Sequence, residues 1–246
     1  MRKLIIALFA LVPSLALSAG GPSVPLDPVD IDLTDKASIQ NGMKIFMNYC
    51  LGCHQQQYQR YQRTAEDNGI SMEILKENLM FTGEKTGDHI KNSMPAKDAK
   101  EWFGSTPPDL TMVARVRKPE WIYTYLRSFY VDPSRPFGVN NTVFPNVGMP
   151  HVLQSLQGIP TKVAATAMVD GEEGVKQGER IVVDGSGELS PEEFDSAMRD
   201  LVNYLVYTAE PTRLQSEKLG TWVIGFLLIF FVFIYLLKKE YWRDVH

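Results

Sequence analysis

The sequence is poor in cysteine, in histidine and in clustered positive charge, and each shortage excludes a class of protein. Two cysteines in 246 residues cannot build a disulfide framework, and four histidines without a second close-spaced ligand pair do not make a structural zinc site. No run of Lys and Arg exceeds two residues and the formal net charge is −4, so the sequence lacks the phosphate-neutralising surface of nucleic-acid-binding proteins. We therefore expect no nucleic-acid partner.

A first apolar segment follows the N-terminus. Arg2 and Lys3 precede the uncharged stretch Leu4–Leu17, and small residues come next, which predicts a secretory signal peptide over residues 1–19. The stretch is shorter than the roughly 20 residues of a membrane span, which argues against a retained helix. It is also uniformly apolar rather than amphipathic and Arg-rich, so we expect bacterial export and not mitochondrial import.

A second apolar segment lies near the C-terminus. Leu219–Leu237 contains no charged residue and, at 1.5 Å per residue, would cover about 28 Å as a helix. Lys238 and Lys239 follow it directly, which places that end in the cytoplasm. We therefore expect a single-pass protein of the bacterial inner membrane, with a periplasmic domain at residues 20–217, an anchor at 218–238 and a cytoplasmic tail at 239–246.

Both cysteines belong to one motif, Cys50-Leu51-Gly52-Cys53-His54, which is the attachment sequence of a c-type haem. Two thiols at this spacing can add to the two haem vinyl groups, and the adjacent imidazole then reaches the iron. A thioredoxin-like redox pair would need a strand before the motif, whereas Ala37–Tyr49 has helical periodicity. The motif occurs once, so we expect one covalently bound haem c.

A second axial ligand is expected among the ten methionines. Two of them, Met94 and Met149, stand apart in Met-Pro sequences. In monohaem cytochromes c of the common helical type, which the sequence resembles, the methionine ligand follows a Pro-rich loop, and here that loop is Thr106–Leu110. This order favours Met149 over Met94, with His151 as a less favoured ligand.

Helical patterns begin and end the exported domain. Thr34 is a candidate N-cap for a helix that leads into the haem motif, and Ser190-Pro191-Glu192-Glu193 is a capping box that opens an amphipathic helix near the far end. We expect these two helices to cross, with Gly42 permitting a close approach. The segments between them are predicted as short helices at Ser71–Met80 and Glu120–Tyr130 and a short hairpin at Lys162–Val183.

Motifs spread over nearly the whole mature chain occur in the order found in one known family. They are Asn48–His54, Tyr58–Tyr61, Trp102–Gly104, Pro107–Leu110, Arg115–Arg117, Gly148–Pro150, Leu201–Leu205, Ala209–Pro211 and a Lys-Lys-x-x-Trp sequence after the anchor. The chain resembles the cytochrome c1 family, the haem-c subunits of the ubiquinol–cytochrome c oxidoreductase (bc1) complex. The resemblance implies a mainly α, class I cytochrome c-like haem domain with a hairpin insertion and one C-terminal transmembrane helix.

The resemblance also implies residue roles. His54 and Met149 would be the axial ligands, Pro107 would supply the carbonyl that orients the imidazole, and Arg117, with Arg115 as the alternative, would pair with a haem propionate.

Finally, the resemblance implies partners. Electrons would arrive from the Rieske iron–sulfur protein and leave to a soluble cytochrome c, the anchor would lie beside cytochrome b, and the chain would perform no substrate chemistry of its own. The alternatives are a freestanding membrane-tethered electron shuttle and the haem subunit of an oxidase.

Overall fold

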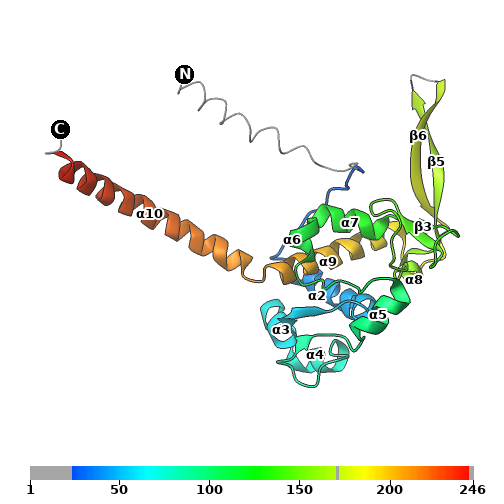
Figure 1. Ribbon diagram of the computed structural model, residues 1–246, viewed down its shortest axis with the longest axis horizontal. Coiled ribbons are helices and arrows are strands. Elements are labelled where there is room, and N and C mark those ends of the chain that lie inside the picture. The colour runs from blue at the N-terminus through cyan, green and yellow to red at the C-terminus, as the bar shows by residue number, and fades with distance from the viewer. Residues whose placement is uncertain (1–23, 170–171, 244–246) are drawn as a thin grey trace.

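Two helices distant in the sequence, α2 (Lys36–Ile45) and α9 (Pro191–Ala209), cross at the centre of the domain (Figure 1). The computed structural model describes residues 24–169 and 172–243, with backbone alone over 164–169 and 172–179, so the expected signal peptide at residues 1–19 lies outside the described part. The mainly α prediction is confirmed. The remaining helical elements are η2 (Phe46–Cys50), α3 (Tyr61–Asn68), α4 (Met72–Asn78), α5 (Ala96–Phe103), α6 (Val113–Arg117), α7 (Pro119–Arg127), α8 (Gln154–Gln157) and α10 (Arg213–Tyr241).

At Gly42 the two helices approach each other backbone to backbone. A Cβ atom built there would lie 2.1 Å from the backbone oxygen of Asp200 and 2.7 Å from the Cβ of Tyr204, so only glycine fits. Polar contacts frame the crossing, because the Asp200 carboxylate accepts hydrogen bonds from Ser38 Oγ (2.7 Å) and Asn41 Nδ2 (2.8 Å). The predicted crossing and the role of Gly42 are confirmed.

The caps of these two helices are formed by side chains, as the sequence suggested, but one cap is shifted. Ser190 and Glu193 form the predicted capping box of α9. The N-cap of α2 is Asp35, whose carboxylate accepts from the backbone N–H of Ser38 at 3.0 Å, and not Thr34. The Thr34 hydroxyl donates instead to Asp32 at 2.6 Å.

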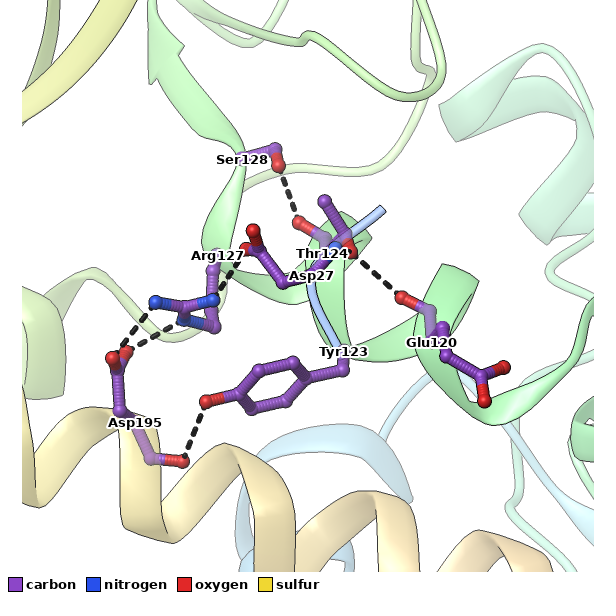
Figure 2. Close-up of polar contacts among 7 residues, drawn as sticks. All are labelled: Asp27, Glu120, Tyr123, Thr124, Arg127, Ser128 and Asp195. Atoms are coloured by element: carbon purple, nitrogen blue, oxygen red, sulfur yellow. Dashed lines mark hydrogen bonds and ion pairs between the residues drawn. The ribbon is translucent and has the colours of Figure 1, made fainter. Parts of the chain in front are cut away.

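The segment before α2 is held on the outside of α7 and α9 by a cluster around one arginine (Figure 2). Arg127, at the end of α7, donates two hydrogen bonds to the Asp195 carboxylate of α9 at 2.6 and 2.7 Å and also pairs with Asp27. The backbone N–H of Asp27 donates to Thr124 Oγ1 at 2.8 Å. Because a bidentate guanidinium–carboxylate pair has fixed geometry, α7 is set relative to both neighbours.

Three antiparallel two-stranded sheets complete the described domain. The third is a hairpin that projects from the domain (Figure 1) and is longer than the sequence predicted, since it begins at Pro160 and not at Lys162. The strands are β1 (Gln56–Arg60) with β2 (His89–Ile90), β3 (Phe129–Val131) with β4 (Val139–Asn141), and β5 (Pro160–Val169) with β6 (Glu172–Val183).

The C-terminal helix α10 leaves the domain as a 29-residue rod (Figure 1). None of its residues is buried, although its centre is strongly apolar. It is the one helix in the described part that is long and apolar enough to cross a membrane. The expected C-terminal candidate transmembrane helix is therefore present, and it begins at Arg213, before the expected span.

We predict that Gly42→Ala destabilises the protein, because the added methyl group must push α2 away from the Asp200 carbonyl. Overpacking of this kind costs about 1–3 kcal/mol in the free energy of unfolding. Urea denaturation of the detergent-solubilised protein measures the loss. The control is Gly87→Ala, whose added Cβ would meet nothing within 4 Å. Equal stability of the two variants would contradict the proposed close packing.

Candidate functional site

The Cys-x-x-Cys-His motif is placed by a π-helical turn at the end of α2. In η2 the backbone N–H of Leu51 donates to the carbonyl of Phe46, five residues back, at 3.0 Å. The chain then tightens, since the N–H groups of Cys53 and His54 both donate to the Cys50 carbonyl, at 3.1 and 2.8 Å. Single π turns inside helices are frequent at functional sites, and this one brings both cysteines and the histidine into one compact turn.

The two thiols are separate from each other and protonated at neutral pH. Cys50 is buried, Cys53 is half-buried, and they form no disulfide. Burial raises the pKa of the Cys50 thiol to about 12 and raises that of Cys53, so neither is a thiolate at neutral pH. A dithiol redox centre needs the opposite, a thiol whose pKa is lowered, and it would not follow a helix.

The imidazole of His54 is oriented by a carbonyl. Its Nδ1 lies 2.8 Å from the carbonyl oxygen of Pro108, and because a carbonyl only accepts, Nδ1 carries the proton and Nε2 keeps a free lone pair. Burial lowers the pKa of this imidazole, which keeps it neutral. The expectation that Pro107 supplies the carbonyl is wrong by one residue. Successive carbonyls in an extended Pro-Pro segment point in different directions, and the second reaches His54.

The Pro-rich loop is anchored to the chain just after the motif. The backbone N–H of Leu110 donates to the Gln55 carbonyl at 2.9 Å, and the Asp109 carboxylate accepts from the backbone N–H of Gln57 at 2.8 Å. The same carboxylate accepts from the N–H of Thr111 at 2.9 Å. These bonds hold the Pro108 carbonyl against the imidazole.

A cavity of about 340 Å³ brings the predicted site residues together. Its walls are mostly apolar, with contributions from α6, α7, α9, the Pro-rich loop and the segment around Met149. The predicted residues that line it are Cys50, Cys53, His54, Pro107, Arg117 and Met149. Pro107 and Met149, which follow Cys50 by 57 and 99 residues, thus line the same cavity as the motif.

Met149 lies in this cavity with its sulfur contacted by a phenol. Tyr125 Oη donates to Met149 Sδ at 3.3 Å, and the Met149 side chain packs on a small hydrophobic cluster that includes Phe129 and Val147. Met94 is half-buried before α5 and is not among the cavity-lining residues. The placement therefore favours Met149 over Met94, as the order along the chain did.

His151 is occupied elsewhere. Its ring stacks on Phe129 with centroids 4.8 Å apart, and its Nε2 lies 2.8 Å from Gln157 Oε1. Burial lowers its pKa to about 4, so the ring is neutral at physiological pH. His151 is not among the cavity-lining residues, which leaves Met149 as the better placed of the two side chains.

Asn141 joins the Met149-bearing segment to α7. Its buried side-chain amide donates to the Tyr125 carbonyl at 2.8 Å and accepts from the backbone N–H groups of Val143 and Phe144 at 2.9 and 3.0 Å. Because every bond of this amide is internal, the chain that leads to Met149 is fixed against the helix that carries Tyr125.

Arg117 and Arg115 differ in their surroundings. The Arg117 guanidinium lines the cavity over the rings of Trp121 (4.8 Å) and Phe144 (5.8 Å), and no described acidic side chain pairs with it. Arg115 is outside the cavity lining and pairs with Glu210 at 3.8 Å. An arginine held by aromatic rings at the rim can still bind an anionic group inside, so the structure favours Arg117.

Sequence reasoning assigned no role to three residues of this site: Pro108, Trp121 and Tyr125. Trp121 and Tyr125 are four residues apart on α7 and their rings stack with centroids 5.0 Å apart at 8°. That spacing was readable from the sequence, but the approach of Tyr125 to Met149 was not.

The donor set fits a haem c. Two free thiols, a neutral imidazole with its Nε2 lone pair available and a thioether share one apolar cavity with an arginine at its rim.

Comparison with known proteins agrees with this donor set. The cytochrome C1 family model matches residues 31–245. The chain is 51% identical to cytochrome c1 of Allochromatium vinosum over the full length of both, and 24% identical to cytochrome c1 of Blastochloris viridis over 86% of this chain and 82% of the relative. It is also 42% identical to a Nitrosomonas europaea protein named ammonia monooxygenase gamma subunit, over 100% of this chain and 99% of the relative. The chain belongs to the cytochrome c1 family.

Proposed function

We propose that this chain is the haem-bearing subunit of a respiratory bc1 complex, with one haem c held by thioether bonds to Cys50 and Cys53 and by His54 and Met149 as axial ligands. The observation that carries the proposal is the single apolar cavity in which these four side chains meet. Family membership implies a haem c cofactor, and the Cys-x-x-Cys-His motif supports covalent attachment.

Each residue has a defined task in this proposal. The Pro108 carbonyl fixes the His54 ring with Nε2 available, and the Met149 thioether is a neutral, soft ligand that favours a high reduction potential. The apolar walls exclude water, and Arg117 compensates negative charge at the rim. The bound haem supplies a one-electron couple, so the protein needs no acid or base to complete the reaction.

We infer the partners from the family. Electrons arrive from the Rieske iron–sulfur protein and leave to a soluble cytochrome c, while the anchor at residues 218–238 lies beside cytochrome b. The domain at 20–217 is periplasmic, and the tail at 239–246 is cytoplasmic, in the bacterial inner membrane. The apolar helix α10 and the basic Lys238 and Lys239 after it support this orientation.

The alternatives are a freestanding membrane-tethered shuttle and a haem subunit of another membrane enzyme. A tethered shuttle would need little more than about 100 residues of haem domain, a small single domain, whereas this chain devotes residues 20–217 to its exported part. The Nitrosomonas relative is named as a subunit of an ammonia monooxygenase, so assembly with such an enzyme is a further alternative.

Blue-native electrophoresis of solubilised membranes, followed by haem staining and identification of co-migrating subunits, separates these possibilities. We expect this chain to migrate with cytochrome b and the Rieske protein. Migration alone would indicate the shuttle. Migration with oxidase or monooxygenase subunits would contradict the bc1 assignment.

We predict that Met149→Ala removes the weak sulfur-to-iron charge-transfer band and lowers the reduction potential, while Cys50 and Cys53 still retain the haem. Absorption spectroscopy and potentiometric titration measure both effects. Met94→Ala is the matched control, because Met94 lies outside the cavity lining, and it should change neither property. Loss of the band in the control alone would show that Met94 is the ligand.

A stop codon placed after Ser216 should yield a soluble, haem-loaded domain. No residue of α10 is buried, so its removal uncovers none of the described core. Fractionation of the periplasm and haem staining measure the outcome, and the truncated domain should lose quinol-dependent reduction because nothing tethers it to the complex. A truncated chain that aggregates or carries no haem would show that α10 is part of the fold.

A further inference from the structure

Contacts of the Tyr125 ring and backbone fix the direction of its hydroxyl. Its ring stacks on Trp121 on one side, with centroids 5.0 Å apart, and meets Phe129 edge-on at 5.2 Å. Its backbone carbonyl is bonded to the Asn141 side chain. With the ring confined in this way, the phenol oxygen has little freedom to choose another partner.

The partner that the structure gives this hydroxyl is the sulfur of Met149, at 3.3 Å. The cavity around the two groups is almost entirely apolar, so no described side chain competes for the bond. A thioether sulfur is a weak acceptor with more than one lone pair. One lone pair can take the phenol proton while another remains for a metal.

We propose that Tyr125 is a positioning residue that donates a hydrogen bond to the Met149 sulfur while that sulfur binds the haem iron, and that it thereby raises the reduction potential. The inference rests on the proposed function, which makes Met149 an axial ligand. A hydrogen bond to the sulfur withdraws electron density from it, and a poorer electron donor stabilises the oxidised iron less. The iron gains or loses one electron, and the phenol keeps its proton throughout.

The test compares two hydroxyl deletions on the same helix. Tyr125→Phe removes the donor and keeps the ring. Tyr123→Phe removes a hydroxyl that lies 3.5 Å from the Asp195 carbonyl, near Arg127 and outside the cavity lining (Figure 2). Both variants are made in the full-length protein, in membranes, and the haem potential is measured by redox titration alongside the sulfur-to-iron band.

We expect Tyr125→Phe to retain the band, with an altered position, and to shift the potential downward. Tyr123→Phe should leave both at their wild-type values. A potential in Tyr125→Phe equal to that in Tyr123→Phe would overturn the proposal. Loss of the band in Tyr125→Phe would also overturn it, because the hydroxyl would then be needed for ligation itself.

A double-mutant cycle separates the hydrogen bond from a general effect of cavity polarity. In a Met149→His background the sulfur acceptor is gone, so adding Tyr125→Phe should shift the potential less than it does in the wild type. An equal shift in both backgrounds would overturn the proposal. If the Tyr125→Phe protein does not accumulate, Raman spectra of the wild-type protein in H₂O and D₂O test the hydrogen bond instead. A hydroxyl bonded to the sulfur should make the frequency of the iron–sulfur stretch differ between the two solvents. An unchanged frequency would refute the bond.

These outcomes are distinct from failure of the proposed function. If Met149 is not a ligand, the wild-type protein lacks the sulfur-to-iron band and Met149→Ala leaves the potential unchanged. If Met149 is a ligand but Tyr125 plays no part, the wild-type band is present and the reduction potentials of Tyr125→Phe and Tyr123→Phe are equal.

Discussion

The backbone contact between α2 and α9 at Gly42 is the constraint on which the remaining arrangement depends. A helix pair that approaches so closely has one relative position, because any side chain at Gly42 would collide with the Asp200 carbonyl. The position of α2 places the π-helical turn that follows it, and that turn places the cysteines and His54. The position of α9 places Leu205, which lines the same cavity. The site is therefore located by the crossing before any of its own side chains is considered.

The second constraint is the position of α7, which bonds to other segments on its outer side and lines the cavity with its inner side. Its outer side carries Arg127, bound to α9 and to the N-terminal segment, and its inner side presents Trp121 and Tyr125 to the cavity. The Asn141 amide then couples the segment before Met149 to the same helix. Met149 thus owes its position partly to α7, a helix that the ion pairs of Arg127 with Asp27 and Asp195 hold in place.

Features that depend on local spacing were predictable, whereas most contacts between distant segments were not. The haem motif and the capping box at Ser190 follow from patterns within a few residues, and the crossing at Gly42 was expected from the resemblance to helical cytochromes c. Choices between neighbours failed: Thr34 and Asp35 are both good N-cap residues, and Pro107 and Pro108 differ only in the direction of a carbonyl. The hairpin was predicted too short because Pro160 reads as a break, although proline is tolerated as the first residue of an edge strand. The contact of Tyr125 with Met149 requires the tertiary fold.

The wide separation of the paired segments sets an order of events during synthesis. Ser38 and Asp200 are 162 residues apart, and Asp32 and Asn203 are 171 apart, so α2 emerges long before the helix that covers it exists. Before α9 packs against α2, the turn that carries Cys50 lacks part of the core that surrounds it in the finished domain. Access to this sulfur is therefore wider before folding is complete than after it, when the cavity is what remains open to it.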